Sequence, residues 1–384
     1  MSLRDIIIIL LRVTCCVLHD FMNLRDSFIR KFDWLMFLPA FLLVIIGLVA
    51  IYSTDLAEME ANFINFKKQA VTFSLGLLAV FIITILNYRQ LRNAKNLLYF
   101  LGAAMLAAVL IFGKNLRGTT GWFILGPLSF QPVEIVKIIL VIFLADYFSR
   151  EGRNIFTFRD IIKSLIAVII FAALVLRQPD LGSSIILFLV WLGMLLASRV
   201  QKKHLLFLAA GFIAAIFLAW FFALAPYQKD RIAVFLNPNL DPLGAGYNIK
   251  QSVIAIGSGG FLGKGIGFGS QSQLRFLPEA HTDFIFALIA EEMGFLMVLF
   301  ILGLFALFFW RILVLAQNSQ NNFTAYLSIG FLIIFLSETL INIGMNLGLM
   351  PVTGLALPFI SLGGSALVSK FMMVGILESA KMRS

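Results

Sequence analysis

Residues 34–51 read WLMFLPAFLLVIIGLVAI, an apolar run without a charged side chain. A run of about 17–25 such residues lets an α-helix cross ~30 Å of hydrocarbon. Similar runs recur along the whole chain, so we expect about ten transmembrane helices, the eighth of them long and therefore tilted or extended. The expected ranges are 34–51, 70–86, 97–112, 132–148, 161–176, 181–197, 205–225, 283–315, 326–345 and 355–377.

The composition places the chain among all-α polytopic membrane proteins. It has 384 residues, of which 60% are hydrophobic and 13% charged, whereas soluble domains contain about 45–50% apolar and about 25% charged residues. A net charge of +10 would suggest nucleic-acid binding in a soluble protein. Here basic residues in cytoplasmic loops that face anionic lipid explain it, and we expect no nucleic-acid partner.

The basic residues also predict the orientation of the chain. They cluster before the first span, after the second, fourth and sixth spans, and in the C-terminal tail, which all lie on one side if there are ten spans. Both termini of this multi-pass protein should therefore be cytoplasmic. Residues 226–282, between spans seven and eight, form a large extracytoplasmic loop, far longer than the usual connection of about 4–6 residues and for that reason expected to be functional.

Residues 1–31 form an N-terminal extension, and residues 32–380 are expected to form one transmembrane domain. The stretch DIIIILLRVTCCVL after a basic start loosely resembles a signal peptide, but no small-residue cleavage site follows it. It fits an interfacial helix or an extension that is not native, with translation starting at Met22. Cys15 and Cys16 are adjacent and cannot form a disulfide framework.

Ionisable residues at membrane depth are costly and are functional candidates by default. Glu134 and Lys137 are three residues apart and so share a helix face. They could form a structural ion pair or bind substrate. Arg177 and Asp180 lie at the tip of a short turn, where Asp180 could cap the next helix and also take part in chemistry.

A glycine-rich stretch, GSGGFLGKGIGFGS at residues 257–270, invites a comparison with phosphate-binding loops. The nucleotide-binding pattern fails, because Ser258 stands where glycine is needed and Gly265 follows Lys264 where Ser or Thr is needed. Free backbone amides could still hold a pyrophosphate, but a flexible hinge is the favoured interpretation.

The stretch LPEAHTDFIFALIAEE at residues 277–292 leads into the eighth span. Thr282 could serve as N-cap, with Asp283 in the first helical turn, where the helix dipole favours a negative charge. Capping does not explain the nearby His281, Glu291 and Glu292. A carboxylate in a partly dry site has raised proton affinity and can act as a general base, so both interpretations stay open.

Zinc-ligand spacing and a nucleophile elbow are absent from the sequence. A divalent cation such as Mg²⁺ or Mn²⁺, held by one or two carboxylates and by substrate phosphates, is compatible with it.

The chain resembles the SEDS family of bacterial cell-wall proteins over residues 32–380. The resemblance lies in RGTTGWFILGPLSFQPVEIVK, RQPDLGSS, residues 244–294 and INIGMNLGLMPVTGLALPFISLGGSAL. Within the family, GSQSQLRFLPE favours the elongation branch, the RodA proteins, over the division branch, the FtsW proteins. Leu362 stands where many relatives have Tyr.

The resemblance implies a peptidoglycan glycosyltransferase that polymerises lipid II during cell elongation and releases undecaprenyl pyrophosphate. The family's essential aspartate falls on Asp283, the motif Gln-Pro-x-Glu-x-x-Lys on Glu134 and Lys137, and the acid of the Gln-Pro-Asp turn on Asp180. The expected partners are a class B penicillin-binding protein and other elongation-complex proteins.

We expect Asp283 to be the general base for the acceptor hydroxyl. The remaining substrate-binding candidates are His281 and cations for the pyrophosphate, with Lys137 preferred over Arg177, Lys264 and Arg275. Two alternatives from other classes are a lipid-precursor flippase or transporter and a scaffold without catalytic residues. A division-type polymerase is the alternative within the family.

Overall fold

The structure, a computed structural model, describes residues 31–56, 63–116, 119–125, 128–151, 157–198, 226–274 and 276–383, with scattered positions between 199 and 225. The expected N-terminal extension up to residue 30, most of the expected seventh span and Arg275 lie outside the described residues.

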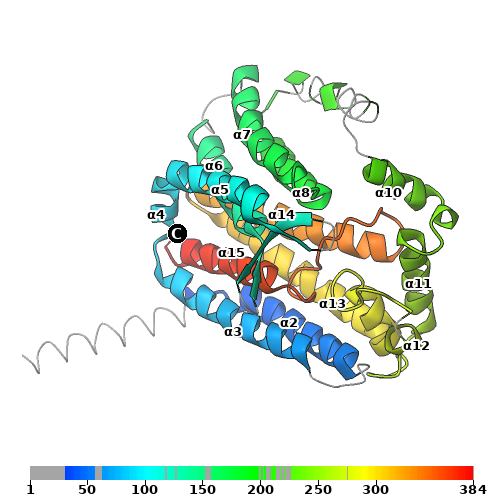
Figure 1. The fold of residues 1–384 in the computed structure, drawn as a ribbon. Coiled ribbons are helices and arrows are strands. Elements are labelled where there is room, and N and C mark those ends of the chain that lie inside the picture. The colour runs from blue at the N-terminus through cyan, green and yellow to red at the C-terminus, as the bar shows by residue number, and fades with distance from the viewer. Residues whose placement is uncertain are drawn as a thin grey trace, which may run out of the picture.

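The described part is a bundle of long helices (Figure 1). The helices are α2 (Trp34–Leu56), α3 (Ile64–Ile85), α4 (Tyr88–Asn93), α5 (Lys95–Phe112), α6 (Pro132–Glu151), α7 (Phe158–Leu176), α8 (Leu181–Leu196), α10 (Pro226–Leu236), η1 (Pro238–Leu240), α11 (Ala245–Ser258), α12 (Ser270–Gln273), α13 (Ile285–Asn318), α14 (Asn322–Asn346) and α15 (Gly364–Met382).

Helices now cover nine of the ten expected spans, and five of them, namely α2, α3, α5, α13 and α14, are long and apolar enough to cross a membrane. The last expected span begins late, because residues 351–363 form an irregular connection and α15 starts only at Gly364. The expected outer loop is not structureless, since it contains α10, α11 and α12.

The expectation of an all-α fold misses one small sheet. Strands β1 (Lys114–Leu116), β2 (Thr119–Leu125) and β3 (Leu128–Phe130) pair in the antiparallel order β1-β2-β3 between α5 and α6. The aromatic and β-branched residues of β2 favour a strand, and Pro132 suits the first turn of the helix that follows.

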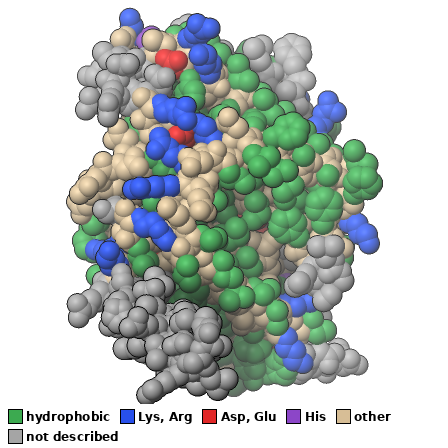
Figure 2. Space-filling model, turned by 90° about the vertical axis from the view of Figure 1, so that its left-hand side faces the viewer, with side chains coloured by type: hydrophobic (Ala, Val, Ile, Leu, Met, Phe, Trp, Pro, Cys, Tyr) green, Lys and Arg blue, Asp and Glu red, His purple; other side chains and the backbone are tan. Residues whose placement is uncertain are grey.

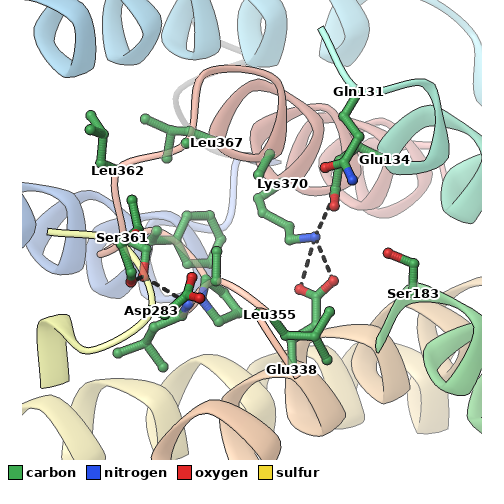
Figure 3. A pocket seen from close by; sticks show the side chains of 18 of the residues that line it. Gln131, Glu134, Ser183, Asp283, Glu338, Leu355, Ser361, Leu362, Leu367 and Lys370 are labelled. Carbon is green, nitrogen blue, oxygen red and sulfur yellow. Dashed lines mark hydrogen bonds and ion pairs between the residues drawn. The ribbon is translucent and has the colours of Figure 1, made fainter. Parts of the chain in front are cut away.

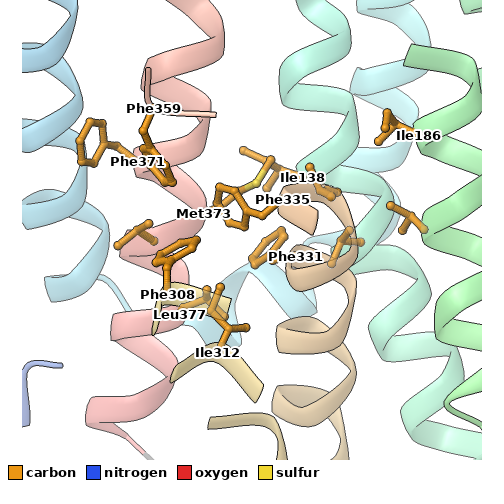
Figure 4. Packing of buried hydrophobic residues seen from close by; sticks show 14 of the residues in the cluster. Ile138, Ile186, Phe308, Ile312, Phe331, Phe335, Phe359, Phe371, Met373 and Leu377 are labelled. Atoms are coloured by element: carbon orange, nitrogen blue, oxygen red, sulfur yellow. The ribbon is translucent and has the colours of Figure 1, made fainter. Parts of the chain in front are cut away.

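Aromatic side chains fill the centre of the bundle between α13, α14 and α15 (Figure 4). Phe308, Phe335, Phe359 and Phe371 are each 2% exposed or less, and their ring centroids lie 5.0–5.7 Å apart in neighbouring pairs. Offset or edge-to-face packing of this kind adds about 0.5–1.5 kcal/mol per pair to the hydrophobic term.

One end of the bundle collects the basic residues, as the loop charges predicted. Asp146 near the end of α6 pairs with Arg92, Lys95 and Arg150, and Asp33 before α2 pairs with Lys381 at 2.8 Å. Figure 2 shows Lys and Arg gathered on this side of the molecule beside a broad hydrophobic surface. The N-terminal side of α2, the connection after α3, the end of α6 and the C-terminus therefore share one end.

Candidate active site

A cavity of about 90 Å³ opens where α6, α8, α14 and α15 meet the turn before α13 (Figure 3). The irregular connection before α15 forms much of its wall, and Trp122 of β2 also lines it. The cavity is smaller than the ~300–1,000 Å³ that usually holds a whole organic ligand. It can therefore admit only the reacting part of a large substrate.

Two lysines and two glutamates beside this cavity form a closed cluster, which we call the ionic square: Glu134, Lys137, Glu338 and Lys370. The Lys137 ammonium lies 2.7 Å from Glu134 and 2.6 Å from Glu338. The Lys370 ammonium lies 3.0 Å from Glu134 and 2.8 Å from Glu338. Each lysine binds one glutamate of α6 and one of α14. Because every charge has two partners of opposite sign, the pairing offsets the cost of burying the four charges.

Glu338 and Lys370 were missed in the sequence, although both lie within expected spans nine and ten. The rule that selected Glu134 and Lys137, that charge at membrane depth is costly, would have selected them equally. Because Glu338 and Lys370 are 32 residues apart, the sequence does not indicate that they form an ion pair. Lys137 is 1% exposed and does not line the cavity, whereas Lys370 does, so the preference for Lys137 as the substrate-facing cation is not supported by its position.

Asp283 lines the cavity, but it does not sit in the first turn of a helix as expected. Residues 281–284 form turns, α13 begins at Ile285, and the Thr282 hydroxyl donates to Glu279 at 2.8 Å instead of capping the helix. The Asp283 carbonyl oxygen accepts hydrogen bonds from the side-chain amides of Asn342 at 3.1 Å and Asn346 at 3.0 Å. These two bonds from α14 fix the backbone that carries the carboxylate.

Asp180 caps α8, which confirms one interpretation, and it also lines the cavity, where its part in chemistry stays a prediction. Its carboxylate accepts from the Ser183 amide at 2.9 Å, the Ser183 hydroxyl at 2.7 Å and the Gln131 side chain at 3.3 Å. Burial raises the pKa of the Asp180 carboxyl, and the hydrogen bonds from Ser183 oppose that shift.

The connection before α15 is held in place by hydrogen bonds to the turn that carries Asp283. The Ser361 hydroxyl donates to the Thr282 carbonyl at 2.7 Å, and the Leu362 amide donates to the His281 carbonyl at 3.0 Å. Phe359 adopts a φ of 66°, which is costly for a bulky residue and marks a backbone held by its surroundings.

The other residues selected from the sequence lie away from the cavity lining. Arg177 is exposed on the α7–α8 turn, and the Lys264 ammonium pairs with Glu291 at 2.9 Å. The His281 carbonyl accepts the Leu362 amide hydrogen bond, but His281 is not among the residues that line the cavity.

Four carboxylates and one ammonium line the cavity, with Lys137 close behind. An anionic phosphate group would meet a net negative surface there. A cluster of three or more His, Cys, Asp or Glu residues able to hold a metal is absent from the described residues. Asp180 and Asp283 could serve a cation that is also bound by substrate phosphates, which is the way Mg²⁺ is usually held.

Comparison with known proteins connects this geometry to one family. The profile of the cell cycle proteins FtsW, RodA and SpoVE matches residues 33–384. The chain is 36% identical to the probable peptidoglycan glycosyltransferase FtsW of Thiomicrospira cyclica, covering 91% of each chain. It is also 36% identical to the peptidoglycan glycosyltransferase MrdB of Escherichia coli K12, covering 89% of this chain and 92% of the relative.

Solved structures are similar over the same length. A chain from a peptidoglycan synthase complex that coordinates polymerization and crosslinking matches with a TM-score of 0.78 and 30% identity, covering 91% of this chain and 97% of the other. The rod shape determining protein RodA of Thermus thermophilus matches with a TM-score of 0.69 and 28% identity, covering 91% and 96%.

Proposed function

The chain belongs to the FtsW/RodA/SpoVE family of cell cycle proteins, and we propose that it is a peptidoglycan glycosyltransferase that polymerises lipid II during cell elongation. The observation that supports this proposal most is the cavity in which Asp283, Asp180 and the ionic square converge. Family members of both the division and the elongation type match this chain equally well in identity.

Asp283 acts as the general base in this proposal. Its carboxylate takes the proton of the acceptor sugar hydroxyl as the oxygen attacks the anomeric carbon of the donor, and the pyrophosphate leaves. A positioned base of this kind contributes about 10²–10⁴-fold to the rate. The two amide hydrogen bonds from α14 to the Asp283 backbone hold it at the cavity.

Lys370 stabilises the departing pyrophosphate, because it is the ammonium that lines the cavity. The net negative lining also gives a Mg²⁺ or Mn²⁺ ion a role here, with Asp180 and Asp283 as candidate protein ligands. Such an ion supplies Lewis-acid stabilisation of the leaving group.

The cavity is small for a lipid-linked substrate, and because the lipid tail stays in the bilayer, the proposed site opens sideways to the bilayer. A volume of about 90 Å³ leaves the lipid tail and most of the peptide outside the protein core. We place the chain in the bacterial inner membrane with both termini cytoplasmic and the cavity end outward, since the basic end carries the C-terminus. A class B penicillin-binding protein is the proposed partner, in line with the related chain from a peptidoglycan synthase complex.

A reconstituted assay tests the proposal. The purified chain in liposomes, alone and with a class B penicillin-binding protein, is given labelled lipid II, and glycan strands are resolved on gels. We expect polymer that EDTA abolishes and that Mg²⁺ or Mn²⁺ restores. Lipid II moved between leaflets without any polymer, in the presence of both metals and the partner, would overturn the proposal in favour of a flippase.

A further inference from the structure

The glycine segment, residues 259–269, lies against α13 at a point where that helix is broken. Gly294 has a φ of 75° and a ψ of −177°, which is not helical. The backbone groups released by the break pair with the glycine segment in four hydrogen bonds of 2.9–3.2 Å. The bonds run from Lys264 N to Glu291 O, from Gly265 N to Glu292 O, from Phe295 N to Gly260 O and from Leu296 N to Phe261 O.

Glycines on both sides make this close approach of two backbones possible. A Cβ added at Gly263, whose φ is 82°, would lie 2.2 Å from the Glu292 carbonyl oxygen. A Cβ at Gly294 would lie 2.2 Å from the Gly263 nitrogen. The glycines therefore serve packing and not the flexible hinge favoured from the sequence, and the amides of Lys264 and Gly265 are occupied instead of free to hold a pyrophosphate.

The length of α13 leads us to expect the break within the depth of the hydrocarbon. Arg311 of α13 pairs with Asp33 at 2.6 Å, at the basic end of the bundle. Phe295 lies sixteen residues before Arg311, which is about 24 Å at 1.5 Å per residue and less than the ~30 Å of the hydrocarbon core.

Large apolar side chains of the glycine segment continue the exposed surface of α13. Phe261 is 62% exposed, Leu262 77% and Phe268 77%. The ring of Phe261 lies 6.2 Å from that of Phe295, which is itself half exposed on α13, as is Leu299. On a helix long and apolar enough to cross the membrane, such residues face lipid, and the patch on the glycine segment is continuous with them.

The lysine ammonium and a further backbone amide of the segment find partners within the protein. Lys264 is its single charged residue and is neutralised by Glu291, which is fully buried. The Gly267 amide donates to the Ser53 hydroxyl at 3.1 Å. Irregular backbone is tolerated at membrane depth only where it is buried in protein or lines a water-filled cavity, and the four hydrogen bonds to α13 turn the backbone of the segment toward the protein.

We propose that the glycine segment is a re-entrant element embedded in the bilayer, with Phe261, Leu262 and Phe268 in contact with lipid acyl chains, and not a water-exposed loop. On one side, the backbone of the segment pairs with the backbone groups of α13 that the break leaves without helical partners. On the other side, its apolar side chains extend the lipid-facing surface of α13. The broken hydrogen-bond ladder of α13 is thus stabilised inside the membrane.

Site-directed spin labelling in nanodiscs of phosphatidylethanolamine and phosphatidylglycerol tests the proposal without needing enzymatic activity. Cys15 and Cys16 are replaced by Ser, and single cysteines are introduced as Phe261→Cys, Leu262→Cys and Phe268→Cys. Leu299→Cys, on the exposed face of α13, is the lipid reference. Asn239→Cys, exposed on η1, is the aqueous reference.

Labels on the glycine segment should collide with oxygen more than with a water-soluble nickel chelate, as at Leu299, and Asn239 should show the reverse. The unlabelled thiols should react with a charged maleimide about tenfold more slowly than Asn239→Cys, because apolar surroundings raise the thiol pKa by about one unit or more. Nickel collisions and maleimide rates equal to those of Asn239 would overturn the proposal.

Discussion

Two clusters of buried carboxylates lie near the two ends of the first segment of α13, residues 285–293, and they differ in which groups bind the carboxylates. At the cavity end, Glu134 and Glu338 are each bound by two lysine ammoniums. At the broken end, Glu291 has one lysine, and Glu292 accepts from the neutral groups of Ser53 at 2.7 Å and Gln273 at 3.2 Å. We call Lys264, Glu291 and Glu292 the kink cluster.

The two clusters also differ in whether a cavity lies beside them. The ionic square stands beside a cavity whose remaining carboxylates, Asp180 and Asp283, complete a negative lining. The kink cluster does not line this cavity, and it holds a short helix, α12, and the glycine segment against α13. Burial of a carboxylate therefore does not by itself identify a catalytic residue, and a cavity beside it is the more informative observation.

The largest expected effect is at Asp283. Asp283→Asn keeps the shape of the side chain but removes the base, so the initial rate of glycan synthesis from lipid II should fall by about 10²–10⁴-fold. The melting temperature of the purified protein should stay within a few degrees. Asp230→Asn, a change of the same kind on the exposed face of α10, is the matched control and should polymerise normally. Polymerisation by a folded Asp283→Asn variant at the wild-type rate would show that the base is elsewhere.

The next effect concerns the ionic square. Lys137→Met leaves Glu134 and Glu338 sharing a single ammonium, and breaking a buried pair costs about 3–5 kcal/mol in free energy of unfolding. The double variant Lys137→Met with Glu338→Gln removes one charge of each sign and leaves the Lys370–Glu134 pair at 3.0 Å. The double variant should lose less free energy of unfolding than the sum of the losses of the two single variants, because the residues share partners.

Unfolding of the single and double variants in denaturant, followed by intrinsic fluorescence, measures this coupling. Strictly additive losses would mean that the four side chains do not act as one unit. Comparing the activity of the double variant, which keeps Lys370, with that of Lys370→Met then distinguishes a purely structural square from one in which Lys370 also contacts the leaving group.

A smaller effect is expected in the glycine segment. Gly263→Ala places a Cβ on a residue with a φ of 82° and within 2.2 Å of the Glu292 carbonyl, which should lower the free energy of unfolding by at least about 1–3 kcal/mol. Gly257→Ala is the matched control, since nothing lies within 4 Å of its Cβ and it sits in α11. That change should stabilise the protein slightly, by up to about 1 kcal/mol. Equal melting temperatures for the two variants would contradict the interlocked packing.

Sequence patterns could predict the helices but not their ends. Apolar runs located α2, α3, α5 and α14 because burial in lipid requires long uncharged segments. They misplaced the start of α15, since Leu355–Phe359 is as apolar as a span but faces the protein interior. The small sheet was missed because β1 and β3 are only three residues long.

Three of the four acids of the site and the Glu134–Lys137 pair could be predicted, whereas Glu338 and its ion pairs could not. Asp283, Asp180 and Glu134 were selected because charged groups at the edge of apolar runs are costly, and the structure brings all three to one cavity. Lys370 and Glu338 meet Glu134 only through the packing of α14 and α15 against α6, which no spacing in the sequence reveals. For the same reason Lys264 was considered for substrate, although its partner is Glu291.

The smallest effect is expected at Lys264, and it separates the two clusters most cleanly. In Lys264→Met, Glu291 keeps hydrogen bonds from the amides of Gln271 at 3.0 Å and Ser272 at 3.2 Å. Because Glu291 keeps these two hydrogen bonds and the lysine side chain is 29% exposed, the loss of stability should stay below the ~3–5 kcal/mol expected for Lys137→Met, and the polymerisation rate should be unchanged. Lys370→Met, at the cavity, should instead lower both the stability and the polymerisation rate. Loss of polymerisation by a stable Lys264→Met variant would make Lys264 a ligand of the pyrophosphate and move part of the active site from the cavity to the glycine segment.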